Sequence, residues 1–170
     1  MQETAQGLYN SLENQRWSFL DRGRTSSELT IPYIMPPDGH NYATKYYTPY
    51  QGVGARGVNN LASKLLLALL PPNAPFFRLV IDRYELDKAK QELGPEGGEQ
   101  LRSDLEKALA DVERSVSQEV EVEAFRVGVF EALKNLLVAG NTLLYLPDEG
   151  GMRVFRLDRY VVKRDPMGNV

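Results

Sequence analysis

Three glycines form a G-x-G-x-x-G pattern at Gly52, Gly54 and Gly57, directly before an apolar stretch. This pattern can cradle the phosphates of a dinucleotide when a strand precedes it and an acidic residue follows roughly 20 residues later. Here a tyrosine- and proline-containing turn precedes it, and the next acidic residue is Asp82. A P-loop is excluded because no lysine follows Gly57 in the required position. A nucleotide-binding enzyme fragment that uses residues 52–57 therefore remains only an alternative.

The same glycines also have a structural interpretation. Glycine lets two backbone segments approach closely, and Asn59 and Asn60 are expected to begin the following helix. Arg56 is then free to bind a carboxylate or a backbone carbonyl. In this interpretation the segment is a close-packing turn that leads into a buried helix.

Other residues with chemical potential are isolated. His40 is the only histidine and lies in a proline-rich loop, and the chain has no cysteine. Carboxylate pairs such as Asp104 with Glu106 lie on solvated helix faces, where nothing shifts their pKa towards acid-base catalysis. We therefore expect no catalytic residue, no bound metal and no cofactor, and we predict that the protein is not an enzyme.

The spacing of apolar residues predicts an α+β fold that is mostly helical. Amphipathic helices are expected at about 4–22, 57–70, 99–120 and 124–139. Short antiparallel strands are expected near 76–81, 142–146, 152–157 and 160–164. The glycine-rich residues 94–98 are expected to form a flexible linker.

Residues 28–51 are rich in proline, glycine and tyrosine, a composition that favours an ordered loop. Tyrosine covers a large area while its hydroxyl stays in water, so such loops pack on their own domain or on a neighbouring subunit. Tyr46, Tyr47 and Tyr50 are thus candidate assembly residues.

Charge is distributed unevenly along the chain. Residues 82–123 contain thirteen acidic and six basic residues, a net charge of −7, while residues 151–170 carry a net charge of +3. Tight binding to DNA needs clustered basic side chains that displace counterions. No such cluster is present, and no apolar run reaches the roughly 18 residues of a membrane span.

The last residues, Asp165 to Asn169, read as a turn with no returning strand. We therefore expect the natural protein to continue beyond Val170.

Three segments resemble a known family. The first is Thr48–Leu65, which includes the glycines. The second is Phe125–Asn141 with Leu143–Pro147, and the third is Arg156–Leu157 with Tyr160–Asp165 and Gly168–Val170. Together they are similar, in order and spacing, to the portal or head-to-tail connector proteins of short-tailed bacteriophages, the podoviruses. Residues 82–101 contain no motif of this kind.

The resemblance implies a structural subunit of a dodecameric portal ring. Such a ring joins capsid to tail, docks the terminase and lets double-stranded DNA pass during packaging and ejection without specific binding. The implied partners are further copies of the subunit, capsid protein, scaffold, terminase and tail adaptors, with no membrane. The implied location is the portal vertex of the virion, with assembly in the host cytoplasm.

On this resemblance residues 1–170 form the N-terminal wing or body region, and stem and clip elements follow later. Another phage capsid or tail scaffold protein remains an alternative. The candidate structural and assembly residues are Gly52, Gly54, Arg56, Gly57, Asn59, Asn60, Tyr46, Tyr47 and Tyr50.

Overall fold

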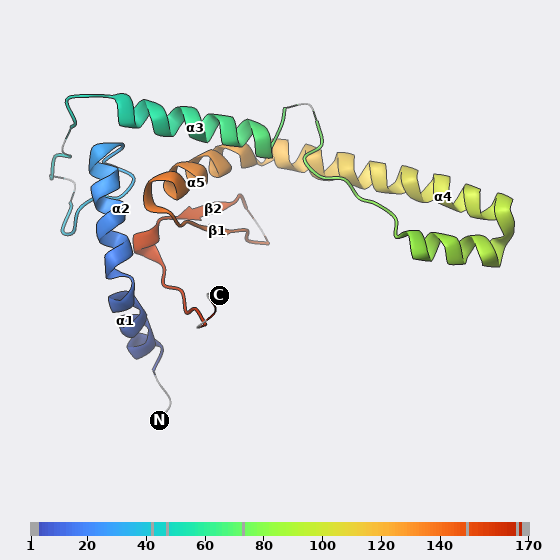
Figure 1. The fold of residues 1–170 in the computed structure, drawn as a ribbon, viewed down its shortest axis with the longest axis horizontal. Coiled ribbons are helices and arrows are strands. Elements are labelled where there is room, and N and C mark those ends of the chain that lie inside the picture. The colour runs from blue at the N-terminus through green and yellow to red at the C-terminus, as the bar shows by residue number, and fades with distance from the viewer. Residues whose placement is uncertain are drawn as a thin grey trace. The chain divides into compact units, whose positions relative to one another are not determined.

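The computed structural model describes residues 4–41, 43–46, 48–72, 74–148, 150–165 and 167. The helices are α1 (Ala5–Gln15), α2 (Trp17–Leu29), α3 (Val53–Leu69), α4 (Arg83–Val122), α5 (Phe125–Ala139) and the short 3-10 helix η1 (Leu157–Arg159). The strands are β1 (Leu143–Tyr145) and β2 (Arg153–Phe155) (Figure 1). The predicted class, α+β and mostly helical, is confirmed.

The chain separates into two compact units, which we describe one at a time. The first unit comprises Met1–Leu66 and Val127–Val170, and the second comprises Leu67–Arg126. The first therefore contains α1, α2, most of α3, most of α5 and the strands. The second contains α4.

Two helices replace the single helix predicted at 4–22. The Thr4 side chain caps α1 by accepting a hydrogen bond from the Gly7 amide, and α1 ends before Arg16. The chain then continues as α2 through Gly23 to Leu29. The predicted end at Gly23 was wrong because this glycine is a packing site. A Cβ there would lie 2.6 Å from the sulfur of Met35 and 3.6 Å from the Cα of Ala139.

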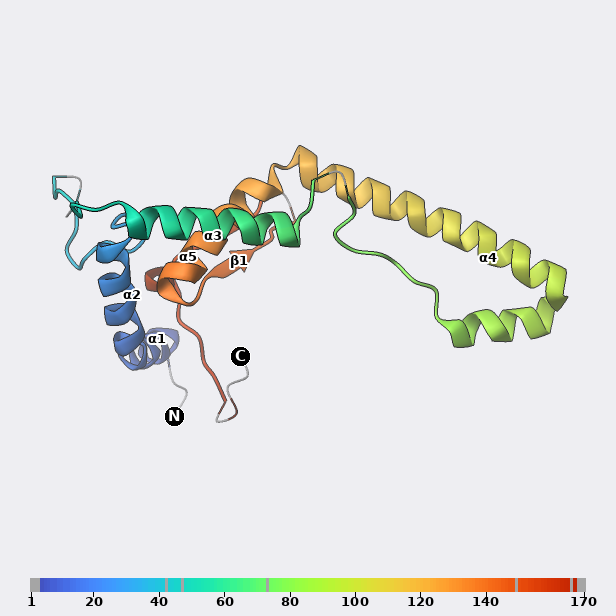
Figure 2. The same ribbon diagram turned by 45° about the horizontal axis from the view of Figure 1, so that its top comes forward.

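Two apolar clusters form the core of the first unit. Leu20, Met35 and Leu157 pack together with Ala139 and Tyr160 against them. The second cluster joins the loop after α2 to α5 and is covered by α3; its members are Ile31, Ile34 and Val138, with Ala55 and Val58. Figure 2 shows α5 lying beside both α3 and β1. The helix is thus the central element of this unit.

Strands β1 and β2 form an antiparallel hairpin in which Leu144 is paired with Val154. The strands predicted at 142–146 and 152–157 are confirmed in shortened form. The strand predicted at 160–164 was wrong. Its tyrosine and valines favour a strand, but no described segment forms a strand ladder with these residues, and a strand needs a partner for its backbone hydrogen bonds.

The second unit is built around α4, which contains the helix predicted at 99–120. Gly94, with φ 78° and ψ 172°, interrupts its helical geometry, and the shorter part before Gly94 turns back beside the longer part (Figures 1 and 2). Residues 95–98 are helical rather than a linker without regular structure. That the turn is flexible stays a prediction.

The strand predicted at 76–81 was also wrong. The segment has no strand partner among the described residues, and the amide of Leu79 donates instead to Oε1 of Glu113 on α4, at 2.6 Å. The Glu113 side chain therefore accepts the hydrogen bond that a neighbouring strand would accept in a sheet. None of the described helices has the length and apolar character needed to cross a membrane.

Candidate assembly site

Helix α3 begins inside the glycine pattern, four residues before the predicted start at residue 57. The Gln51 side chain accepts a hydrogen bond from the Val53 amide at 2.7 Å, and the Gly52 carbonyl accepts one from the Arg56 amide at 3.0 Å. These bonds satisfy groups at the start of the helix that would otherwise lack partners. Asn59 and Asn60 therefore lie in the second turn and do not begin the helix.

Gly54 is the glycine of the pattern at which two backbones approach closely. A Cβ at this position would lie 2.6 Å from the carbonyl oxygen of Leu29 and 3.1 Å from Cγ2 of Thr30. The first turn of α3 thus lies directly on the end of α2. Ala55 and Val58 then pack against the apolar cluster that α5 completes.

The remaining predicted residues of α3 face away from this contact. Apart from the backbone of its own helix and its chain neighbours, no atom of the described residues lies within 4 Å of the position that a Cβ on Gly57 would take; for Gly52 the nearest such atom is Nε of Arg56, at 4.0 Å. Arg56, Asn59 and Asn60 are exposed. Because helix runs through the pattern and no described strand precedes it, the glycines do not form the loop that cradles phosphates.

Two of the candidate tyrosines, Tyr46 and Tyr50, lie outside the core. Tyr46 stacks on His40 with ring centroids 4.3 Å apart, and Tyr50 is fully exposed, at 104%. Tyr47 lies outside the described residues. The buried residues of this loop are instead Ile31, Ile34 and Met35. The exposed tyrosines are free to contact another molecule.

An arginine that we did not predict as a site joins distant parts of the first unit. Arg16, between α1 and α2, donates from Nη1 to the carbonyl of Leu157 at 2.8 Å and to the carbonyl of Tyr160, and from Nη2 to Glu13 at 3.2 Å. Its side chain is 11% exposed. Burial raises the pKa of the nearby Tyr160, and the positive charge of Arg16 opposes this shift. The sequence did contain one signal for this role: Arg16 is a charged residue that interrupts the apolar stripe of the helix predicted at 4–22.

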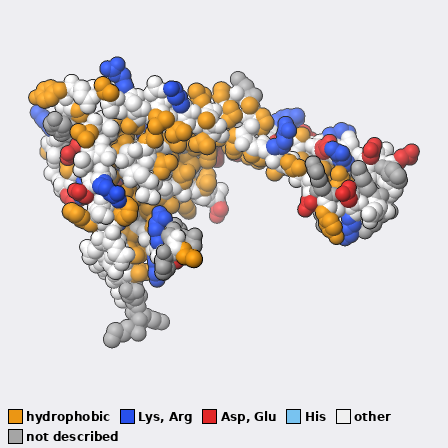
Figure 3. Space-filling model, in the orientation of Figure 1, with side chains coloured by type: hydrophobic (Ala, Val, Ile, Leu, Met, Phe, Trp, Pro, Cys, Tyr) orange, Lys and Arg blue, Asp and Glu red, His pale blue; other side chains and the backbone are white. Residues whose placement is uncertain are grey.

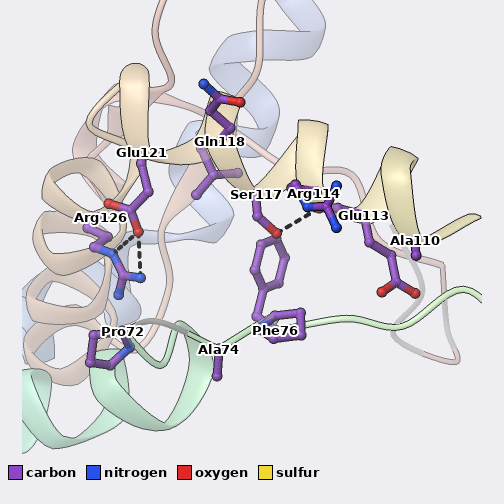
Figure 4. A pocket seen from close by; sticks show the side chains of 12 residues that line it. Pro72, Ala74, Phe76, Ala110, Glu113, Arg114, Ser117, Gln118, Glu121 and Arg126 are labelled. Atoms are coloured by element: carbon purple, nitrogen blue, oxygen red, sulfur yellow. Dashed lines mark hydrogen bonds and ion pairs between the residues drawn. The ribbon is translucent and has the colours of Figure 1, made fainter.

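A second arginine, Arg126, joins segments of the second unit that are distant in the sequence. Arg126 donates from Nη1 to the carbonyl of Leu70 and from Nη2 to the carbonyl of Pro71, at 3.2 Å. Its Nη2 is also 2.7 Å from Oε1 of Glu121 (Figure 4). This role could not be predicted from the sequence, because the carbonyl partners lie more than fifty residues away.

The Arg126–Glu121 pair borders an open cleft of about 880 Å³. Figure 4 shows Pro72, Ala74 and Phe76 on one side and side chains of α4, including Glu113 and Ser117, on the other. Ser117 Oγ donates to the Glu113 carbonyl at 2.8 Å, within its own helix. No group of three or more His, Asp or Glu residues in the described parts of the chain could hold a metal ion. The geometry offers packing surfaces and backbone anchors.

Comparison with known proteins identifies the family. The family described as "Bacteriophage head to tail connecting protein" matches residues 2–170.

This chain belongs to that family.

The chain is 44% identical over 174 residues to the portal protein of Escherichia phage T7, and this alignment covers 99% of the chain and 31% of the relative. Identity to the portal protein of Enterobacteria phage T3 is 43%, with 99% and 31% covered. Identity to the portal protein of Enterobacteria phage SP6 is 34%, with 96% and 30% covered. The chain thus spans about a third of the length of these curated relatives. The resemblance inferred from the three sequence segments is confirmed.

Proposed function

We propose that this chain is the N-terminal part of a structural portal subunit that connects the phage head to the tail. The observation that carries the proposal is the match to portal proteins along almost the whole chain, residues 82–101 included. The subunits form a closed ring, which we expect to be dodecameric. The ring occupies one vertex of the virion after assembly in the host cytoplasm.

Within this ring the chain contributes to the outer wing or body. Capsid protein, scaffold, terminase and tail adaptors are its protein partners, and the terminase supplies the ATP hydrolysis. Exposed apolar side chains on several elements, among them Trp17, Tyr50 and Val127, support a protein that buries more surface on assembly than it does alone. The subunit itself is not an enzyme and takes no cofactor.

Double-stranded DNA passes through the ring without sequence-specific binding. Each phosphate neutralised by a basic side chain adds salt-dependent affinity, which would retard a sliding duplex. The net charge of −3 supports a protein that does not hold DNA tightly.

The test is electron microscopy of the purified protein that contains this chain. We expect rings with a central opening, whose symmetry gives the number of subunits. A compact monomer under all conditions of salt and concentration contradicts the proposal. Incorporation into heads provides a second readout, because portal function requires the rings to copurify with capsid protein.

A further inference from the structure

Helix α3 has an exposed apolar stripe to one side of the face that packs on the core. Val53, Gly57 and Leu61 follow one another at four-residue spacing, which places them on one side of a helix. Val53 is 70% exposed and Leu61 is 47% exposed. The stripe borders a shallow cleft of about 460 Å³, whose wall also includes Arg56 and Lys64.

The charges beside this stripe are all positive. Residues 39–81 contain four basic residues, Lys45, Arg56, Lys64 and Arg78, and no acidic residue. Neither Arg56 nor Lys64 has an ion-pair partner among the residues that the structure describes. Figure 3 shows blue side chains among orange ones over α3. The surface therefore suits an apolar partner with negative charges at its edge.

Helix α4 carries a stripe with the opposite charge. Leu105, Val112 and Val116 are 38%, 49% and 40% exposed, and their spacing places them on one face. Asp104 and Asp111 lie next to the stripe and are 77% and 73% exposed. Both form ion pairs within α4, but exposed pairs of this kind are weak and are readily exchanged.

The spacing of the charges on the two helices also matches. At a rise of about 1.5 Å per residue, Arg56 and Lys64 are about 12 Å apart along α3, and Asp104 and Asp111 are about 10.5 Å apart along α4. The bare backbone at Gly57, near the middle of the α3 stripe, leaves room for a side-chain ridge of another helix.

We propose that α3 of one subunit docks on α4 of a neighbouring copy, with the apolar stripes in contact and Arg56 and Lys64 facing Asp104 and Asp111. This inference rests on the proposed function, because it assigns a contact within the ring. The two surfaces are different, so the contact is heterologous. Heterologous contacts generate rings when the rotation between successive copies closes, whereas a surface that binds itself generates two-fold dimers.

Cross-linking between copies tests the contact directly in a full protein whose only cysteines are the introduced ones; residues 1–170 contain none to remove. One form of the full protein carries Leu61→Cys and a differently tagged form carries Ala108→Cys, which lies on the α4 stripe midway between the two aspartates. The two forms are coexpressed, assembled and treated with a short thiol-reactive cross-linker. We expect a covalent dimer that carries both tags.

Ser63→Cys is the matched control, because Ser63 is exposed on a different side of α3. Its yield of mixed dimer with Ala108→Cys should be at least about fivefold lower. Rings that form normally but give equal yields for Leu61→Cys and Ser63→Cys overturn the docking inference and leave the proposed function intact. Absence of rings from the unmodified protein contradicts the proposed function itself.

Charge reversal gives an independent readout. Arg56→Glu with Lys64→Glu should lower the apparent association constant of the subunits about tenfold, through like charges facing each other. Adding Asp104→Lys and Asp111→Lys should restore it to within about twofold. The pairing of these four residues is contradicted if the two substitutions to Glu leave assembly unchanged. It is also contradicted if the two substitutions to Lys do not restore assembly.

Discussion

At Gly54 a single hydrogen atom determines how closely α3 approaches the end of α2. The position of a Cβ there, 2.6 Å from the Leu29 carbonyl oxygen, is closer than two such atoms can approach. The carbonyl belongs to the backbone, so relief requires moving a helix end. Residue chemistry alone predicted that a glycine matters here, but not which of the three.

Replacing Gly54 should therefore destabilise the first unit. We expect Gly54→Leu to lower the free energy of unfolding by about 1–3 kcal/mol or more, because overpacking forces the backbone apart. Chemical denaturation measures the loss. Gly57→Ala is the control, and it should stabilise by about 0.5–1 kcal/mol, since alanine favours the helix and meets no atom there. Equal effects of the two substitutions contradict the assignment.

Arg16 should be equally sensitive, for a different reason. Arg16→Met keeps much of the side-chain volume but removes the donors to the Leu157 and Tyr160 carbonyls. We expect a loss of about 2–4 kcal/mol, because partly buried carbonyls lose charge-assisted hydrogen bonds. Thermal unfolding of Arg153→Met, whose side chain is exposed, serves as comparison. A loss no greater than that of Arg153→Met would show that the anchor contributes little.

Tyr160 should make stability depend on alkaline pH. Burial raises its pKa above 10.0 in the folded protein, so the folded state holds the proton more tightly than the unfolded state does. The resulting stabilisation is complete below pH 10 and is lost as pH rises through the folded pKa. Denaturation curves between pH 9 and 11 should show a steeper loss in the wild type than in Tyr160→Phe. Parallel curves would contradict the prediction.

At the level of elements, Arg126 connects the end of α3 to the start of α5. Its hydrogen bonds to Leu70 and Pro71 hold the turn that follows α3, where prolines cannot donate backbone hydrogen bonds. The arginine supplies the donors that this turn lacks.

Removing that anchor should loosen the turn locally. In Arg126→Met, hydrogen exchange of peptides covering residues 67–72 and 74–76 should become at least about tenfold faster, because local opening loses the charged hydrogen bonds. Arg102→Met is the matched control, since Arg102 pairs with Glu106 on the exposed surface of α4. We expect little change there. Equal exchange in both variants would show that the Arg126 hydrogen bonds do not hold this turn.

Helices with a clear apolar period and the hairpin with a clear turn were predictable from the sequence. Segments whose structure depends on residues far away in the chain were not. The apolar period at 124–139 gave α5 to within one residue, and the turn at 147–151 gave the β1–β2 hairpin. The segments 76–81 and 160–164 are rich in the β-branched and aromatic residues that favour strands, but this composition does not supply a second strand. The course of α2 through Gly23 could not be foreseen, because it depends on Met35 and Ala139.

The candidate site shows the same division. Gly54 was named because glycine permits close approach, a property of the residue itself. Arg16 and Arg126 were missed because their acceptors are backbone carbonyls, which every residue has and which leave no trace in a sequence.

At the scale of the whole molecule, the expectation that the protein binds no nucleotide can be tested. We expect millimolar ATP or NAD to leave the melting temperature of the protein unchanged. A site occupied at a hundredfold excess over its dissociation constant would add about 2.7 kcal/mol, which a thermal shift readily detects. A shift that Gly54→Ala abolishes would revive the nucleotide-binding alternative for residues 52–57.

At the two arginine anchors, the donor position and the acceptor positions should differ in how many substitutions they tolerate. A carbonyl is present whatever residue occupies position 160 or 71, so the acceptor side can exchange side chains without losing the bond while the backbone path holds. On the donor side no other side chain offers five N–H groups in a planar fork. In a library that samples every substitution, positions 16 and 126 should therefore accept almost nothing, while position 71 accepts many side chains; the acceptors Leu70 and Leu157 are constrained only by their own burial in the core.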